Sequence, residues 1–445
     1  MHTIIHGDCL EELKKLDDNS IDAVVCDPPY GLSNTKPQQV ADVLKAWVTG
    51  DTVSVPAKRG GFMGKDWDSF VPPPAVWEEC MRVLKPGGHM AVFAGARTQD
   101  LMGLSIRLAG FEIRDTLGWI HSQGFPKGQD LGKIIDKKLG AEREVVGRTK
   151  TPFKVDAAAH RGTSLQGSVN GDFSKQVDEN GYRYTEHTAP ATSEAKRWTG
   201  WNSQLKPAIE PIILARKPLV GTVANNVLAH GVGGLNIDAC RVGASGGGTH
   251  CNNRDTDGKC LGHGDAGKSQ SGATFHADEA TSPVGRFPAN VLLDEHAAKE
   301  MDKQSGVSVS KAGGRSGTHF SAGNEGVPTP DRPRGGHTDS GGASRFFQVF
   351  KYQAKAPKKE RPVIEREDGT KIQHATVKPL ALMEWLVSLI VPPGGTVLDP
   401  FAGTGTTLQA AINKGFRPIG IEQDADYIQL IHQRLEGGEQ STRNN

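Results

Sequence analysis

The sequence predicts an α/β fold in which both ends of the chain contribute to one doubly wound, Rossmann-like sheet, with a large loop-rich insert between them. Two observations predict the sheet: short apolar runs alternate with helically spaced segments over residues 1–125, and the same alternation returns over residues 372–436. A third observation predicts the insert. Of the 55 glycines, 20 fall within residues 241–345, where apolar periodicity is weak.

The amino-terminal part of the sheet is expected from four strands. Thr3–His6 and Ile21–Cys26 are short apolar runs, and His89–Phe93 and Phe111–Ile120 follow the same pattern. Polar turns end the first two strands. The helices predicted between these strands are Leu10–Leu16, Ala75–Leu84 and Thr98–Ala109.

The carboxyl-terminal part repeats this style with strands at Thr396–Leu398 and Arg417–Ile421. Helices are predicted at Ala381–Ile390, Thr407–Asn413 and Tyr427–Leu435. Because strands that alternate with helices pair in parallel, helices are expected on both faces of one shared sheet.

Composition limits the class of protein. A chain of 445 residues is too long for a single core, and its net charge of +1 requires any basic surface to be local. Six scattered cysteines predict no disulfide framework, which fits a reducing cytoplasm. Residues 1–10 lack a basic segment followed by an apolar run, and about 18 consecutive apolar residues occur nowhere, so neither a leader nor a membrane span is expected.

The segment Asp27-Pro28-Pro29-Tyr30 follows directly on a predicted strand, where open α/β sheets bind ligands. The prolines leave rigid carbonyl groups free to accept hydrogen bonds, and the Asp27 carboxylate can only accept. Together they suit an exocyclic base amine, whose nitrogen gains positive charge as it attacks a methyl group. Tyr30 offers a flat face on which a base can stack. A proline-rich turn that only ends a strand is the alternative.

A second chemical segment follows the predicted strand at 396–398 and opens a helix. Glycines there let the backbone approach a ligand, but Leu408 replaces the third glycine of the dinucleotide fingerprint and the lysine of a phosphate loop is absent. Glu422 ends the next strand at the spacing where an acid bonds ribose hydroxyls, which indicates an adenosine-type cofactor. The candidate cofactor residues are Asp399, Phe401, Gly403, Thr404, Gly405, Thr406, Thr407 and Glu422.

These two segments resemble the DNA amino-methyltransferases that act on the N6 of adenine or the N4 of cytosine. In the family's β-type arrangement the catalytic tetrapeptide precedes the target recognition region and the cofactor loop lies near the carboxyl end, as in this sequence. Thr376-Val377-Lys378-Pro379 is similar to the segment that contacts the cofactor's amino-acid end, although Ala375 stands where a proline is common. Gly7-Asp8-Cys9 is similar to the turn whose acid bonds the cofactor adenine.

The resemblance implies S-adenosyl-L-methionine as methyl donor, double-stranded DNA as substrate and a cognate restriction nuclease as candidate partner. Asp27 favours adenine N6, because cytosine N4 enzymes of the family more often have serine there. Cytosine N4 methylation stays open, and so does, in another functional class, an inactive DNA-binding protein of the same fold. The intact catalytic and cofactor residues oppose the inactive alternative.

The resemblance also suggests domain boundaries. Residues 1–125 and 372–436 are expected to form the catalytic domain, and residues 437–445 a flexible tail. Residues 126–371 are assigned to target recognition, with 241–345 expected to be mobile until DNA binds and with 201–242 as an ordered scaffold.

Basic residues that flank these segments are candidate DNA contacts, with a solvated linker as the alternative for each. They are Lys58, Arg59, Lys65, Lys351 and Lys355. The cysteines and histidines between residues 240 and 263 contain no Cys-x-x-Cys pair and suit no common structural zinc site, so no metal is expected.

Overall fold

The structure is a computed structural model that describes residues 2–33, 35–56, 68–122, 124, 128–154, 182–243, 285–310, 339–350, 360–366, 368–374 and 376–442. The chain divides into two compact units. Unit 1 comprises Met1–Ala57, Phe70–Ser122 and Ile209–Asn445, and unit 2 comprises Lys58–Ser69 and Gln123–Ala208. No helix among the described residues is long and apolar enough to cross a membrane.

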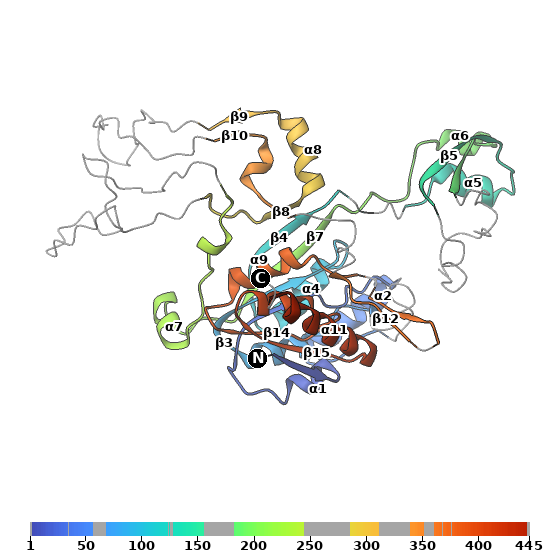
Figure 1. Cartoon of the computed structure of the whole chain (residues 1–445). Coiled ribbons are helices and arrows are strands. Elements are labelled where there is room, and N and C mark those ends of the chain that lie inside the picture. Colours follow the sequence, from blue (N-terminus) through green and yellow to red (C-terminus); the bar gives the residue numbers. More distant parts are fainter. Residues whose placement is uncertain are drawn as a thin grey trace, which may run out of the picture. The chain divides into compact units, whose positions relative to one another are not determined.

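Unit 1 is built on a nine-stranded sheet with the order β1-β15-β14-β2-β3-β7-β4-β8-β11 (Figure 1). Its strands are β1 (Thr3–His6), β2 (Ile21–Cys26), β3 (Leu84–Phe93), β4 (Glu112–Ile120), β7 (Ile209–Arg216), β8 (Val291–Asp294), β11 (Gln348–Phe350), β14 (Thr396–Asp399) and β15 (Arg417–Glu422). The two carboxyl-terminal strands lie between β1 and β2, which confirms that both chain ends share one sheet. Among the nine strands, β7 alone runs antiparallel to its neighbours.

Helices cover both faces of this sheet. On one face, Leu13, Trp77 and Ile106 pack against the side chains of β2 and β3 that point towards them. On the other face, Leu382 and Leu386 pack against the alternate side chains of β2, β3 and β14. The helices of unit 1 are α1 (Cys9–Leu13), α2 (Pro37–Val48), α3 (Pro74–Val83), α4 (Gln99–Leu108), α7 (Val223–His230), α8 (Glu295–Ser305), α9 (Leu380–Ile390), α10 (Thr406–Asn413) and α11 (Ala425–Thr442), with short 3₁₀ turns η4 (Asp238–Cys240) and η5 (Ala343–Phe346).

Three strands of the sheet come from residues 126–371, which the sequence assigned wholly to target recognition. The strand β7 lies between β3 and β4, and β8 and β11 extend the sheet beyond β4. The expected ordered part at 201–242 therefore contributes to the catalytic sheet, and the domain boundary predicted at residue 125 does not mark the edge of that sheet. Within 241–345, the described residues include β8 and α8, so this segment contains regular structure as well as loops.

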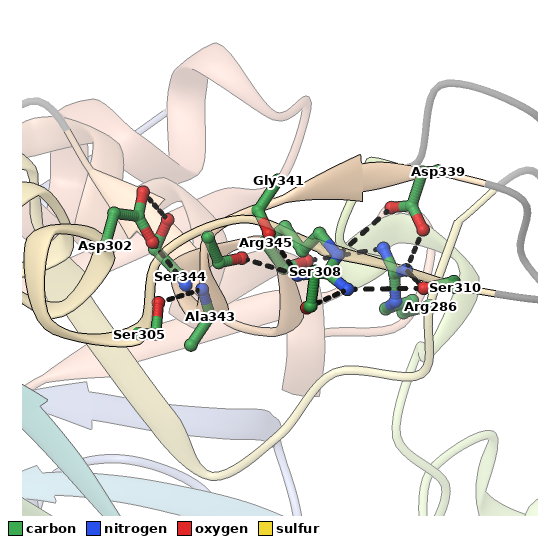
Figure 2. Close-up of polar contacts among 11 residues, drawn as sticks. Arg286, Asp302, Ser305, Ser308, Ser310, Asp339, Gly341, Ala343, Ser344 and Arg345 are labelled. Carbon is green, nitrogen blue, oxygen red and sulfur yellow. Dashed lines mark hydrogen bonds and ion pairs between the residues drawn. The ribbon is translucent and has the colours of Figure 1, made fainter.

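A polar network fixes the chain beside the outer edge of the sheet (Figure 2). Asp339 forms an ion pair with Arg286 and lies near Arg345, and the side chains of Asp339 and Arg286 are almost fully buried. Both guanidinium groups lie over the ring of Phe346. Asp302 of α8 accepts hydrogen bonds from the backbone and hydroxyl of Ser344. These contacts link α8 and η5 to the antiparallel pair of β9 (Ser308–Val309) and β10 (Ser340–Gly341).

A second small hairpin of unit 1 pairs β12 (Ile364–Glu365) with β13 (Lys371–Ile372). Unit 2 is a separate α/β element. Its antiparallel strands are β5 (Val145–Lys154) and β6 (Tyr182–Thr188), and its helices are α5 (Leu131–Lys138) and α6 (Ser193–Arg197). The buried carboxylate of Asp136 holds these elements together, because it pairs with Arg143 and accepts hydrogen bonds from Thr192.

Candidate active site

The predicted catalytic and cofactor residues gather at the carboxyl edge of the parallel strands. The chain leaves β14 through α10 to β15 on one side, and leaves β2 through α2 and α3 to β3 on the other, so β14 and β2 flank the point where the strand order reverses. Such a switch point is where open α/β sheets bind ligands. Asp27 follows β2, Asp399 ends β14 and Glu422 ends β15.

The turn after β2 is held in one conformation. Gly31 has φ of +67°, and a Cβ atom there would lie 2.8 Å from the backbone nitrogen of Val71, so glycine is required. The hydroxyl of Thr98 donates a hydrogen bond of 2.6 Å to the carbonyl of Tyr30. Pro28 is buried and Pro29 is partly buried. The tetrapeptide therefore presents Asp27 from a fixed backbone.

The Asp27 carboxylate has two partners. The Tyr30 hydroxyl donates to Oδ1 over 2.7 Å, and the Lys378 ammonium lies 2.8 Å from Oδ2. The Asp27 side chain is 24% exposed, so it is still accessible to a ligand. Burial raises the pKa of Tyr30, and the adjacent carboxylates of Asp27 and Glu210 raise it further, which keeps its hydroxyl a donor.

Glu210 is a site residue that the sequence did not predict. Its Oε2 lies 3.2 Å from Lys378 Nζ and 3.5 Å from the Tyr30 hydroxyl, and its Oε1 lies 3.7 Å from His121 Nε2. Burial opposes the charge on Lys378, but the carboxylates of Asp27 and Glu210 outweigh this effect and raise its pKa. Because β7 is antiparallel, its beginning lies at the edge where the parallel strands end, and a search of strand ends alone overlooks it.

The glycine-rich turn after β14 is organised around two acids. The Glu422 carboxylate accepts hydrogen bonds of 2.8 Å from the backbone N–H groups of Gly403 and Asp424, one to each oxygen. Gly403 and Gly405 have φ of +53° and +74°. Asp399 accepts a hydrogen bond from the Phe401 backbone, and burial raises the pKa of Asp399 to about 7.

The remaining residues of this turn mostly contact other parts of the fold. Thr404, Thr406 and Thr407 are buried, and Arg434 of α11 donates to the Thr404 carbonyl over 2.6 Å. The ring of Phe401 lies 6.1 Å from that of Trp77, between the turn and α3. These contacts fix the start of α10, whose N-terminus lies at the carboxyl edge of the sheet.

The smaller predicted segments reach the same edge. Asp8 follows β1 and caps α1, where it accepts hydrogen bonds from the backbone of Leu10 and Glu11. Burial raises the pKa of the neighbouring Cys9 thiol to about 12. Pro379 is the N-cap residue of α9, whereas the ammonium of Lys378, expected near the cofactor's amino-acid end, lies against Asp27.

The candidate DNA contacts lie outside the described residues. These are Lys58, Arg59, Lys65, Lys351 and Lys355. Of the cysteines and histidines weighed for a metal, Cys240 is described, and its buried thiol contacts the Trp385 carbonyl. No group of three or more possible metal ligands occurs among the described residues.

Comparison with known proteins gives matches over much of the chain. A model of the N6/N4 DNA methylases matches residues 21–151 and 281–433. The type II methyltransferase M.HindIII of Haemophilus influenzae is 23% identical over 97% of this chain and 94% of its own length. The DNA adenine methyltransferase YhdJ of Escherichia coli is 44% identical over 14% of this chain and 21% of its own.

Solved structures match more distantly. The complex of M1.HpyAVI with SAM has a TM-score of 0.37 at 14% identity, covering 98% of this chain and 99% of that one. The cytosine-N4-specific PvuII DNA methyltransferase has a TM-score of 0.42 at 12% identity, covering 97% and 87%. The family model spans more than half of the sequence, including the turn that carries Asp27 and the acids of the cofactor edge. The chain therefore belongs to the DNA methylase family of N6 and N4 amino-methyltransferases.

Proposed function

We propose that this protein transfers a methyl group from S-adenosylmethionine to the exocyclic N6 amine of adenine in double-stranded DNA, at a specific sequence. The observation that carries the proposal is the position of Asp27, on a rigid turn at the switch point and beside the two acids of the glycine-rich turn. Asp27 also favours adenine over cytosine by family resemblance. The adenine-specific name of YhdJ, a partial relative, agrees with that choice.

The residues of the glycine-rich turn fit the adenosyl donor. Each oxygen of Glu422 is fixed by one backbone N–H and retains a further lone pair, so the carboxylate can accept from two ribose hydroxyls. A Cβ at Gly403 would have no neighbour closer than 3.8 Å, which leaves room above the turn. Asp399 is an acid that a cationic amino-acid end would favour in its ionised form.

The chemistry then requires little from the protein except alignment and charge stabilisation. The donor carries its methyl group on a sulfonium, and the neutral thioether that remains after the transfer is a good leaving group. Asp27 and a carbonyl of the turn accept the N–H bonds of the target amine and stabilise the positive charge that develops on its nitrogen. The Tyr30 ring supports the base after it leaves the duplex.

Unit 2 is the proposed DNA-contacting element within residues 126–371. Basic residues outnumber acidic ones among its described residues, whereas the whole chain is nearly neutral. Trp198 and Trp201 are exposed at 39% and 60%, with their rings 5.1 Å apart, and the exposed Lys196 and Arg197 precede them. Phosphate contacts and aromatic stacking are the interactions that this surface can offer.

The test is product analysis. The protein is incubated with methyl-labelled S-adenosylmethionine and unmethylated DNA, and the DNA is digested to nucleosides. N6-methyladenine is the expected labelled product. N4-methylcytosine would replace the adenine assignment, and label found in RNA or protein but not in DNA would overturn the proposal.

We further propose that the protein acts in the cytoplasm together with a cognate restriction nuclease, as the resemblance to restriction-associated DNA amino-methyltransferases implies. An extract of the source cells should then cleave unmodified DNA and spare DNA that this protein has methylated. Equal cleavage of both would remove the nuclease from the proposal.

A further inference from the structure

Glu210 shares its two nearest donors, Tyr30 and Lys378, with Asp27 of the catalytic turn. Tyr30 and Lys378 are the two side chains that contact Asp27. Both of them also lie next to Glu210. Their distances to Glu210 are longer, at 3.5 and 3.2 Å, than their distances to Asp27, at 2.7 and 2.8 Å. Glu210 is therefore a second acceptor within reach of both donors.

We propose that Glu210 is a positioning residue that takes over the Lys378 ammonium and the Tyr30 hydroxyl, and so releases Asp27 for the target amine. This inference rests on the proposed function, because it assigns Asp27 to the amine. Each Asp27 oxygen already has one lone pair occupied, Oδ1 by the Tyr30 hydroxyl and Oδ2 by the Lys378 ammonium, and the ammonium also neutralises the charge that the target amine would meet. A small shift of these donors towards Glu210 frees acceptor capacity at Asp27 without leaving either donor unpaired.

Charge leads to the same expectation. The carboxylates of Asp27 and Glu210 and the ammonium of Lys378 together carry one negative charge, next to the place where the target nitrogen becomes positive. Without the charge of Glu210 the three groups would be neutral, and the full attraction of Lys378 would fall on Asp27. The effect of Glu210 should therefore depend on the presence of the lysine.

The surroundings hold Glu210 in place. It pairs with Trp119 in the register of β7 with β4, and the next β7 residue, Pro211, accepts a hydrogen bond from the Ala94 backbone beside β3. His121 lies 3.7 Å from the other carboxylate oxygen, and its ring packs against Trp119. The Glu210 side chain is 29% exposed, so a glutamine at this position remains hydrated.

The test compares single-turnover methyl transfer by the full chain at saturating S-adenosylmethionine and DNA. Glu210→Gln is expected to lower the transfer rate constant by about 10- to 100-fold and to change the cofactor Kd by less than about threefold. Glu112→Gln is the matched control, because Glu112 pairs with Arg216 at the opposite end of β7 over 2.6 Å. Its rate constant should equal that of the wild type.

A charge-removal experiment separates this role from a structural one. In a Lys378→Met background, Glu210→Gln should lower the rate constant by less than about threefold, because no ammonium remains on Asp27 to be withdrawn. Glu210→Asp keeps the charge and should transfer faster than Glu210→Gln. Any of three results would overturn the proposal. In the first, Glu210→Gln transfers the methyl group at the wild-type rate. In the second, Glu210→Gln lowers the rate constant as much in the Lys378→Met background as in the wild type, and in the third, Glu210→Asp is no faster than Glu210→Gln.

Failure of this proposal is distinguishable from failure of the proposed function. The wild-type protein reports the latter through its labelled nucleoside. If the wild type forms N6-methyladenine while the variants behave in any of the overturning ways, only the role of Glu210 is lost. Thermal unfolding of each variant shows whether it is folded, and a variant that stays folded is interpreted by its rate constant.

Discussion

The clearest quantitative expectation concerns Glu422 and the ribose of the cofactor. Glu422 is 9% exposed, and each oxygen of its carboxylate already accepts one backbone N–H over 2.8 Å. In Glu422→Gln, the amide NH₂ group would face one of these N–H groups, so that two donors oppose each other. The variant should lose both the fixed orientation and the charge of the acceptor.

The magnitude follows from the bonds involved. A hydrogen bond to a charged group contributes about 1.5–3 kcal/mol, and one tenfold change in Kd corresponds to about 1.4 kcal/mol. Glu422→Ala and Glu422→Gln should therefore weaken binding of S-adenosylmethionine by about 10- to 100-fold, measured by isothermal titration calorimetry. Glu384→Gln is the control, because that glutamate contacts Asn413 and Lys414 of the α10 end.

A ligand change shows whether the ribose itself is involved. The wild type should bind S-adenosylhomocysteine at least about tenfold more tightly than its 2′,3′-dideoxy analogue. In Glu422→Ala the two ligands should bind with nearly the same Kd, because the acceptor of the hydroxyls is gone. An unchanged Kd for S-adenosylmethionine, or an equal loss for the analogue in both proteins, would refute the ribose assignment and leave Glu422 as an anchor of the turn.

Three further expectations follow from buried acids and from unit 2. Burial raises the pKa of Asp399 from 3.8 to about 7, so its stabilising contribution is complete below about pH 4 and is lost as pH rises through 7. The cofactor-free Asp399→Asn variant should therefore gain thermal stability relative to wild type as pH rises from about 4 to 7. A parallel pH dependence of the two proteins would contradict this. The Arg286 guanidinium outweighs burial and lowers the pKa of Asp339, so the contribution of Asp339 to stability is present above about pH 4 and is lost as pH falls through the lowered value. Asp339→Ala should reduce the free energy of unfolding in urea by about 3–5 kcal/mol without changing the cofactor Kd. An unchanged unfolding midpoint would contradict this. Trp201→Ala should weaken DNA binding in an electrophoretic mobility assay by roughly 1–3 kcal/mol while sparing cofactor affinity, and unchanged DNA affinity would remove this surface from the interface.

Local sequence patterns were sufficient where a strand and its turn are adjacent in the chain. The apolar run before Asp27 and the one before Asp399 were placed correctly, because buried parallel strands are short and almost wholly apolar. Because parallel strands end at a common edge and β14 lies beside β2, the turns that follow these two strands share that edge. The helix predicted at 75–84 ends at Val83, and β3 begins at Leu84, earlier than the predicted start at His89, where the register of the β2 pairing is irregular.

The pairing of strands that are far apart in the chain cannot be predicted from local sequence patterns. β7 was recognised as ordered apolar sequence, but its place between β3 and β4 depends on partners about 100 residues away. β8 and β11 are only four and three residues long and lie within glycine-rich sequence, so their local signal is weak. Glu210 was missed for the same reason, because its approach to Lys378 depends on the antiparallel direction of β7.

The central claim is that the turn carrying Asp27 transfers the methyl group while the carboxyl-terminal turn holds the donor. Asp27→Ala tests it most directly, with methyl transfer to DNA and the Kd of S-adenosylmethionine measured on the same preparation. We expect labelled N6-methyladenine to fall by at least about 100-fold and the Kd to stay within about threefold of wild type. Methylation at the wild-type rate, or loss of cofactor binding as complete as the loss of activity, would contradict the assignment of Asp27 to the target amine.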